Sequence, residues 1–372
     1  MMRPAFTSTK SAAAFALLLL VLLALPIVVG KNLLPPREQA YSIQSWGNGP
    51  YPWIRNQIFE ETNDIDIAIV GSSHIWNAIN TPYVQAQLTE KLGRPAIVRT
   101  ICWGGAGYDG LYFIAQDLLA HRRVRLLVFY DENPAPGFRN NTAPVWFRFG
   151  DSADALRGLP LPDQSLLYFA AVVGMPRNLL AQLRPNRPAP LVTDQPNYWT
   201  GFANSPNPAT QLGCLTVRKG FATDPLAAPA PFAAFTPATG ATPADAIIYS
   251  PATETDFQFS TAPLPAWQIH FARQFAALLS AHGVRAAMLS LPPLAEARSP
   301  VIAERAFWPD ILPGVTLLGL PPAKLFGNLT DAELRQIYSD PAHFGANGQS
   351  YFTSLITPAL IELNLAQENL KN

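Results

Sequence analysis

The segment from Ile65 to His74 constrains the fold of this chain more than any other. Ile65 to Val70 is an apolar run interrupted only by Asp66, which is typical of a central parallel strand covered on both faces. Gly71 permits a sharp turn at its end, so that Ser72 and Ser73 follow at the carboxyl edge of a sheet. Because open α/β sheets build their sites at that edge, we expect a functional serine there, although a plain polar turn explains the same residues.

Further apolar segments extend this strand into a sheet. Predicted strands lie at about 96–102, 124–130, 284–291 and 315–320, and predicted helices at about 81–92 (capped by Thr81), 111–121, 265–282, 331–337 and 348–363. This alternation predicts a doubly wound α/β domain with helices on both faces of a five-stranded parallel sheet, in the flavodoxin-like order 2-1-3-4-5. The regularity is lost between about 135 and 264, where many of the 37 prolines gather. We expect an inserted lid or binding surface there rather than more sheet.

The amino terminus has the pattern of a membrane segment. Arg3 and Lys10 precede an apolar run from Ala12 to Gly30, about the nineteen residues that cross a hydrocarbon core. The predicted organisation is a cytoplasmic tail over 1–10, one transmembrane helix over 11–30, a linker over 31–62 and the α/β domain over 63–372. A signal peptide cleaved near Val28 and Gly30 remains the alternative. The expected location is the bacterial inner membrane, single-pass, with the domain in the periplasm or outside the cell.

Composition narrows the possible partners. Hydrophobic residues make up 49% of the chain and support a sizeable core, while charged residues are 14% and the formal net charge is +0. Without a basic run, nucleic acid is not an expected partner. Cys102 and Cys214 form no Cys-x-x-Cys pair, so neither a zinc site nor another metal or cofactor is expected. The two cysteines form either a disulfide in an exported protein or two separate buried thiols.

A glycine-rich turn after the second predicted strand allows a nucleotide-binding alternative. Gly105, Gly107 and Gly110 match Gly-x-Gly-x-x-Gly, and Asp131 follows about twenty residues later, as in dinucleotide-binding folds. The pattern is short in a chain with 23 glycines, and an exported domain meets little dinucleotide. A tight crossing from strand to helix is therefore the preferred interpretation.

A pair of polar residues near the carboxyl terminus matches the serine at the first strand. Asp340 and His343 lie three residues apart in the loop before the last helix. An aspartate so placed can accept from imidazole Nδ1–H and leave Nε2 to take a serine proton, although surface polarity also explains an isolated Asp-x-x-His. We predict that the loop folds back over the end of the first strand and joins Ser73. His74 is expected to point elsewhere on its turn, with substrate contact as the alternative.

In this order, these motifs resemble the four blocks of the SGNH (GDSL-like) hydrolase superfamily. The resemblance covers about 64–133 and 284–363, with Gly71-Ser72-Ser73 as the first block and Ser72 in place of its usual aspartate, which puts the nucleophile at Ser73. Gly107 corresponds to the glycine of the second block, Asn133 to the asparagine of the third, and Asp340 and His343 to the last block. Cys102 stands where the family usually has asparagine, and the residues around Asn133 depart from Gly-x-Asn-Asp.

The resemblance implies acyl-serine chemistry. Ser73, His343 and Asp340 would be catalytic, and the amides of Ser73 and Gly107 with the Asn133 side chain would form the oxyanion hole. Water as acceptor gives an esterase, and a sugar hydroxyl gives an acyltransferase. An amino-terminal anchor before Gly-Ser-Ser looks like the SGNH-like proteins that accompany membrane-bound O-acyltransferases, such as the teichoic acid D-alanyl transfer protein and the alginate acetylation proteins. The Asp-x-His motif of the alginate proteins is missing here.

The expected function is therefore a membrane-anchored envelope serine esterase or O-acyltransferase. Its expected substrates are acyl (acetyl) esters of a carbohydrate polymer, and a membrane-bound O-acyltransferase is its candidate partner. The main alternative keeps the fold without catalysis, as a glycan-binding or scaffold protein of the envelope. A lipase or thioesterase is a third interpretation, and it would need an apolar acyl channel that the sequence does not reveal.

Overall fold

The computed structural model describes residues 6–32, 37–38, 40–41, 51–103, 105, 107–130, 146, 155, 157–169, 232–233, 235–238, 257–259, 264–304 and 308–368. The chain divides into two compact units. The smaller unit comprises 1–44 and 141–187, and the larger comprises 45–140 and 188–372. The predicted sheet and every predicted site residue belong to the larger unit.

Five parallel strands form the sheet of the larger unit, in the order β2-β1-β3-β5-β7. They are β1 (Ile65–Gly71), β2 (Val98–Cys102), β3 (Val124–Tyr130), β5 (Arg285–Leu289) and β7 (Thr316–Leu318). The predicted fold class, strand number and order are confirmed. The strand ends differ from the prediction by up to a few residues, because apolar residues continue past the last ladder hydrogen bond.

The interior strand β1, which lies between β2 and β3, carries the turn with the two serines. All seven of its residues are buried. Gly71 pairs with Cys102 of β2, and Ile69 pairs with Val128 of β3. Because these strands are parallel and nearly level, the turns that follow them meet at one edge of the sheet.

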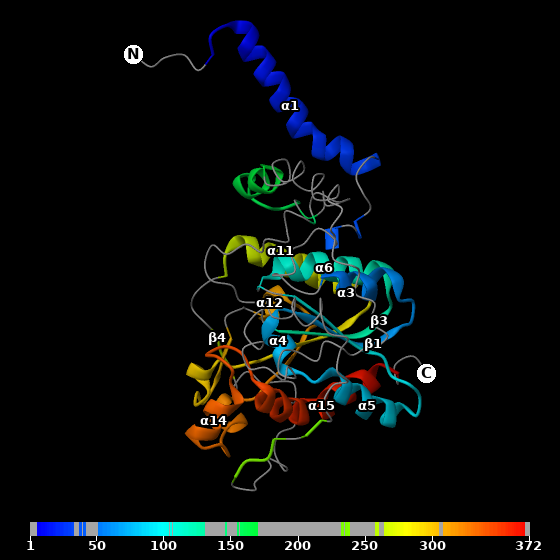
Figure 1. The fold of residues 1–372 in the computed structure, drawn as a ribbon, viewed down its shortest axis with the longest axis vertical. Helices are drawn as coiled ribbons and strands as arrows, with labels where there is room; N and C mark the ends of the chain where they lie inside the picture. The colour runs from blue at the N-terminus through cyan, green and yellow to red at the C-terminus, as the bar shows by residue number, and fades with distance from the viewer. Residues whose placement is uncertain are drawn as a thin grey trace, which may run out of the picture. The chain divides into compact units, whose positions relative to one another are not determined.

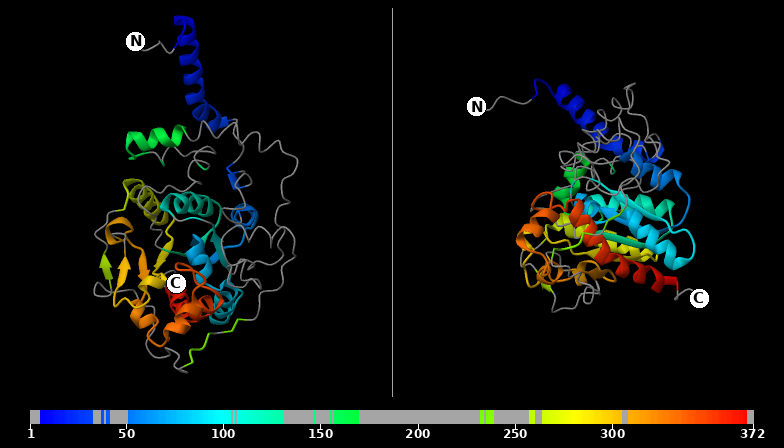
Figure 2. Two further views of the ribbon diagram at one scale, coloured as in Figure 1. Left: turned by 60° about the vertical axis from the view of Figure 1, so that its left-hand side comes forward. Right: turned by 60° about the horizontal axis from the view of Figure 1, so that its bottom comes forward.

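Four long helices cover the two faces of the sheet. They are α5 (Thr81–Leu92), α6 (Tyr108–His121), α11 (Ala266–Ala281) and α15 (Ala346–Glu368). Figures 1 and 2 show α6 and α11 side by side on one face, and α5 and α15 on the other. Each predicted helix is present, and α15 continues beyond its predicted end at 363. A single proline, Pro358, lies within it.

The predicted cap of α5 is wrong by one residue. Asn80 is the N-cap, and its Oδ1 accepts from the amide of Tyr83 at 3.1 Å. The Thr81 hydroxyl instead bonds to the hydroxyl of Thr100 on β2, and Thr81 is buried. The asparagine side chain reaches the third amide of the helix, as a capping residue must, while the threonine is used for packing against the sheet.

Several short elements were not predicted, because they are too short to show a hydrophobic period. They are α3 (Tyr51–Arg55), η2 (Asn56–Glu60), α4 (Ser73–Ala78), η6 (Leu294–Glu296), α12 (Trp308–Ile311), α13 (Pro322–Leu325) and a second parallel sheet of β4 (Phe257–Phe259) with β6 (Ile302–Glu304). The left view of Figure 2 shows β4 and β6 as a pair of short arrows. The helix predicted at Asp331 is α14 (Asp331–Ile337).

In the smaller unit, the longest element is the amino-terminal helix α1 (Thr9–Asn32). Its side chains are exposed along most of residues 13–24, including Leu17 and Leu20, which are each 64% exposed. Within the part of the chain that the structure describes, no helix combines the length and the apolarity that crossing a membrane requires. A second helix spans 161–169, and Tyr41 packs edge-on against Trp146 with ring centroids 4.8 Å apart.

The carboxylate of Asp66 anchors the start of β1 and gives a first prediction. Its side chain is 4% exposed and accepts from Arg94 Nη2 at 2.7 Å and from the Ile97 amide at 2.8 Å. Asp66→Ala leaves that amide without its acceptor, so we expect the free energy of unfolding to fall by about 2 kcal/mol. Urea denaturation followed by circular dichroism measures it.

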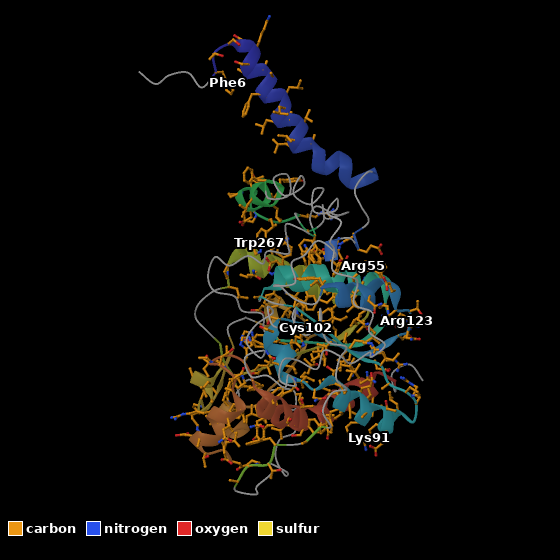
Figure 3. The ribbon with its side chains drawn as sticks, in the orientation of Figure 1. Phe6, Arg55, Lys91, Cys102, Arg123 and Trp267 are labelled. Atoms are coloured by element: carbon orange, nitrogen blue, oxygen red, sulfur yellow. The ribbon has the colours of Figure 1, made fainter. Side chains whose placement is uncertain are left out.

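Asp64→Ala is the matched control. Asp64 lies 3.8 Å from Arg123, but the two side chains are 54% and 79% exposed, and Figure 3 shows Arg123 at the surface. Solvent screens this pair, so its loss should change stability by less than about 0.5 kcal/mol. Equal effects of the two substitutions would contradict the role assigned to Asp66.

Candidate active site

Ser73 lies where β1 gives way to the short helix α4. Ser72 is the extended N-cap residue, with φ −82° and ψ −175°, and its carbonyl accepts from the Trp76 amide at 3.2 Å. Ser72 is only 1% exposed, whereas Ser73 is partly exposed. The Ser73 amide belongs to the first turn of α4, where amides have no acceptor within the helix. Of the two adjacent serines, Ser73 is the one that solvent and a ligand can reach.

The loop that carries Asp340 and His343 is closed at its base. Tyr338 and Phe344 form an antiparallel bridge, and the Ser339 amide donates to the His343 carbonyl at 2.9 Å. Gly348, in the first turn of α15, lies against the Ile337 carbonyl so closely that a Cβ atom would overlap it. This close approach brings the end of α14 and the start of α15 together, and therefore limits how far the loop can move.

The structure brings Ser73, His343 and Asp340 into one chain of hydrogen bonds. Ser73 Oγ lies 2.8 Å from His343 Nε2, although the two residues are 270 positions apart in sequence. His343 Nδ1 lies 2.8 Å from Asp340 Oδ2 and 3.0 Å from Oδ1. Since a carboxylate can only accept, Nδ1 carries the proton, and Nε2 is left to accept from the serine hydroxyl. The side chains of His343 and Asp340 are 24% and 28% exposed, so the site is open to solvent.

Local contacts keep the Asp340 carboxyl group ionised. Burial by itself raises the pKa of Asp340, but the opposing effects are larger together. The amides of Ala342 and His343 each donate to Oδ1 at 2.8 Å, and the His343 imidazole adds its own hydrogen bond and, when it is protonated, its positive charge. The net result is a pKa below the ordinary value, so Asp340 is a carboxylate that can orient the imidazole.

His74 lies against the face of His343, contrary to the expectation that it points elsewhere. The two ring centroids are 4.4 Å apart with an interplanar angle of 22°. On its other side, His74 stacks on Tyr130, the last residue of β3, at 5.1 Å and 24°. Burial, followed by the nearby charge of His343, lowers the pKa of His74 to about 4, with Asp340 acting in the opposite direction. In the sequence, only the position of His74 next to Ser73 indicated that it could lie at the site. Nothing in the sequence indicated that Tyr130 lies there.

The low pKa of His74 predicts a loss of stability in acid. Between its unfolded value of about 6.5 and the folded value of about 4, His74 binds a proton only in the unfolded chain, so stability falls as the pH falls through this window. The expected loss from this residue is about 3 kcal/mol between pH 7 and pH 4. Urea unfolding at both pH values should show a smaller loss in His74→Phe than in the wild type, and equal losses would contradict it.

Gly107 occupies a conformation that favours glycine. It is the N-cap of α6, with φ +126° and ψ 135°, and a Cβ atom there would overlap Oδ1 of Asp109. Asp109 is fully buried and accepts from Trp267 Nε1 at 2.9 Å, while Gln268 Oε1 accepts from the Tyr108 amide at 2.7 Å. The turn after β2 is thus held rigidly at the same edge of the sheet as Ser73.

Two other residues predicted for this edge, Gly110 and Cys102, make contacts within the domain. Gly110 lies within the first turn of α6, where its amide donates to Asp109 Oδ1 at 3.1 Å. Cys102 ends β2 and is buried, with its Sγ 3.6 Å from the Ile69 carbonyl, and Figure 3 shows it in the interior. Asn133, Asp131 and Cys214 lie outside the described residues.

Across the described ranges, no group of three or more His, Cys, Asp or Glu side chains is placed to hold a metal ion. Comparison of the chain with family models, with curated proteins and with solved structures finds no match.

Proposed function

We propose that this protein is a serine esterase or O-acyltransferase of the SGNH type, acting through an acyl-serine intermediate. The observation that carries the proposal is the chain from Ser73 Oγ through His343 to Asp340, with contacts of 2.8 Å at both imidazole nitrogens. A serine, a base that accepts its proton and a carboxylate that orients the base are together the parts of an activated oxygen nucleophile.

In the proposed first half-reaction, His343 Nε2 takes the proton of Ser73 as Oγ attacks the ester carbonyl. The carbonyl oxygen becomes an oxyanion, which the amides of Ser73 and Gly107 and the side chain of Asn133 would stabilise. The bond to the leaving alcohol then breaks, and the imidazolium of His343 returns its proton to the departing oxygen. Asp340 stabilises the imidazolium while it exists.

The second half-reaction transfers the acyl group. His343 takes a proton from the acceptor hydroxyl, which attacks the acyl-serine, and Ser73 leaves with that proton. Water as acceptor completes hydrolysis, and a sugar hydroxyl completes transfer. No step needs a metal or a cofactor. Loss of one oxyanion donor costs on the order of a hundredfold in rate in enzymes of this kind.

We further propose that the substrate is an acyl ester, such as acetyl, of a carbohydrate polymer in the bacterial envelope, and that a membrane-bound O-acyltransferase is a partner. This part of the proposal rests on the sequence: the resemblance of Gly71-Ser72-Ser73 to the anchored SGNH-like proteins, and the apolar run within 11–30 after Arg3 and Lys10. It places the α/β domain in the periplasm or outside the cell.

Covalent labelling of the full chain tests the proposal. A fluorophosphonate probe should label the folded protein at one serine, and mass spectrometry of the digested protein should map the adduct to Ser73. The same preparation should release p-nitrophenol from p-nitrophenyl acetate. Added glycan acceptors should then distinguish hydrolysis from transfer, because only transfer gives an acetylated glycan. A folded protein that neither labels nor turns over the ester would favour the non-catalytic glycan-binding or scaffold function instead.

A further inference from the structure

We propose that His74 is a positioning residue, the middle ring of a three-ring stack that holds the His343 imidazole in line with Ser73 Oγ. The stack runs from Tyr130 at the end of β3, through His74 on α4, to His343 in the loop before α15. As a role in catalysis, this inference rests on the proposed function. As a statement that the stack restrains the His343 ring, the inference does not depend on the proposed function.

The hydrogen bonds of His343 leave one motion of its ring weakly restrained. Its contacts to Ser73 and Asp340 are made at Nε2 and Nδ1, on opposite edges of the ring and close to its plane. Such contacts fix the ring within its plane, but they resist tilting about the line that joins them only weakly. A flat surface against the ring face, 4.4 Å away and nearly parallel, opposes that tilt.

The position of His74 in the chain makes it suited to this task. It directly follows Ser73 in the first turn of α4, so one helix sets both the nucleophile and the surface against which the base rests. Its Nδ1 lies 3.4 Å from the hydroxyl of the buried Ser72, and its far face is backed by Tyr130. The ring is therefore supported on both sides by elements of the sheet domain.

The charge state of His74 also suits a residue that positions the His343 imidazole. Burial keeps its imidazole neutral, so it presents an uncharged π face to His343. When His343 takes the proton of Ser73, that face attracts the imidazolium, whereas a second positive ring would repel it. A neutral aromatic ring of similar shape should therefore replace His74, and a side chain without a ring should not.

The test compares His74→Phe, which keeps a ring, with His74→Ala, which removes it, in the full chain. With p-nitrophenyl acetate we expect Ala to lower kcat by about ten- to a hundredfold with KM changed by less than about threefold. Phe should restore kcat to within about fivefold of the wild type. His121→Ala is the matched control, because His121 contacts the ring of Phe59 at 4.5 Å and is not part of this stack, and it should leave kcat unchanged.

Two kinetic outcomes would overturn the inference. Equal kcat in Ala and wild type would show that the stack does not position the base. Equal losses in Ala and Phe, with circular dichroism unchanged, would show that a nitrogen of His74 is needed rather than its ring face.

Nuclear magnetic resonance of ¹⁵N-labelled imidazoles separates this inference from the proposed function. In the wild type and in His74→Phe, the Nδ1 proton of His343, which faces Asp340, should give a sharp signal, and in His74→Ala freer tilting of the ring should broaden that signal by exchange with solvent. If the wild type is neither labelled by the probe nor able to cleave the ester, the proposed function fails. These spectra still decide whether His74 holds the His343 ring in place. Unchanged His343 signals in His74→Ala would overturn the inference.

Discussion

Replacing Ser73 with alanine is expected to abolish fluorophosphonate labelling and to lower kcat for p-nitrophenyl acetate by at least about a thousandfold. The substitution removes the hydroxyl oxygen that lies 2.8 Å from His343 Nε2, so no acyl-enzyme can form at this position. Backbone structure should be retained, because Ser73 is partly exposed and its amide remains in α4. Labelling is read by gel fluorescence and the rate by p-nitrophenol release.

Ser72→Ala is the control that separates the two adjacent hydroxyls. Ser72 is buried, and its Oγ contacts His74 at 3.4 Å rather than His343. We expect Ser72→Ala to be labelled at Ser73 and to lose at most about tenfold in kcat, since the hydroxyl that it removes supports a neighbouring ring and is not the nucleophile. Labelling that persists in Ser73→Ala and disappears in Ser72→Ala would overturn the assignment of the nucleophile.

Asp340→Asn is expected to lower kcat by about a thousandfold or more while leaving the fold intact. The asparagine carbonyl can still accept from the amides of Ala342 and His343, which Asp340 Oδ1 holds at 2.8 Å. Its NH₂ group would then face His343 Nδ1 and donate to it. The imidazole would have to carry its proton on Nε2, where it could no longer accept from Ser73.

Asp331→Asn serves as the control for that change. Asp331 also pairs with a cation, Arg298, at 2.8 Å, but its side chain is 80% exposed, and it begins α14, whereas the loop of His343 follows the other end of that helix. Its kcat should match that of the wild type within error. If Asp340→Asn retained more than about a tenth of wild-type kcat, the carboxylate would not be orienting the base.

The strands and long helices of this fold could be predicted because their signals are local. Five apolar segments separated by helical patterns predicted the parallel sheet and its order, which the structure confirms. The order follows from general rules of connection in α/β domains rather than from any residue. Elements of only a few residues, such as α4 and the β4–β6 sheet, lack enough residues to show a period, and the sequence did not reveal them.

The site residues that could be predicted are likewise those with a local signal in the sequence. Asp340 and His343 could be paired from sequence, because three residues of one loop bring a carboxylate within reach of Nδ1. Gly71 and the two serines could be placed at a strand end for the same local reason. Whether Ser72 or Ser73 is accessible depends on the first turn of α4, and the sequence chose between them only through a resemblance.

By itself, the sequence determined that this chain builds a parallel sheet with a serine at the end of its first strand and an Asp-x-x-His loop after its last strand. Only the tertiary structure decided that Ser73 meets His343 across 270 positions, and that His74 turns its ring onto His343 instead of away from it. The physical reason is that hydrophobic periodicity and short-range hydrogen bonds depend on residues that are close together in the sequence. The distance and tilt of two side chains from distant segments depend on how every helix between them packs.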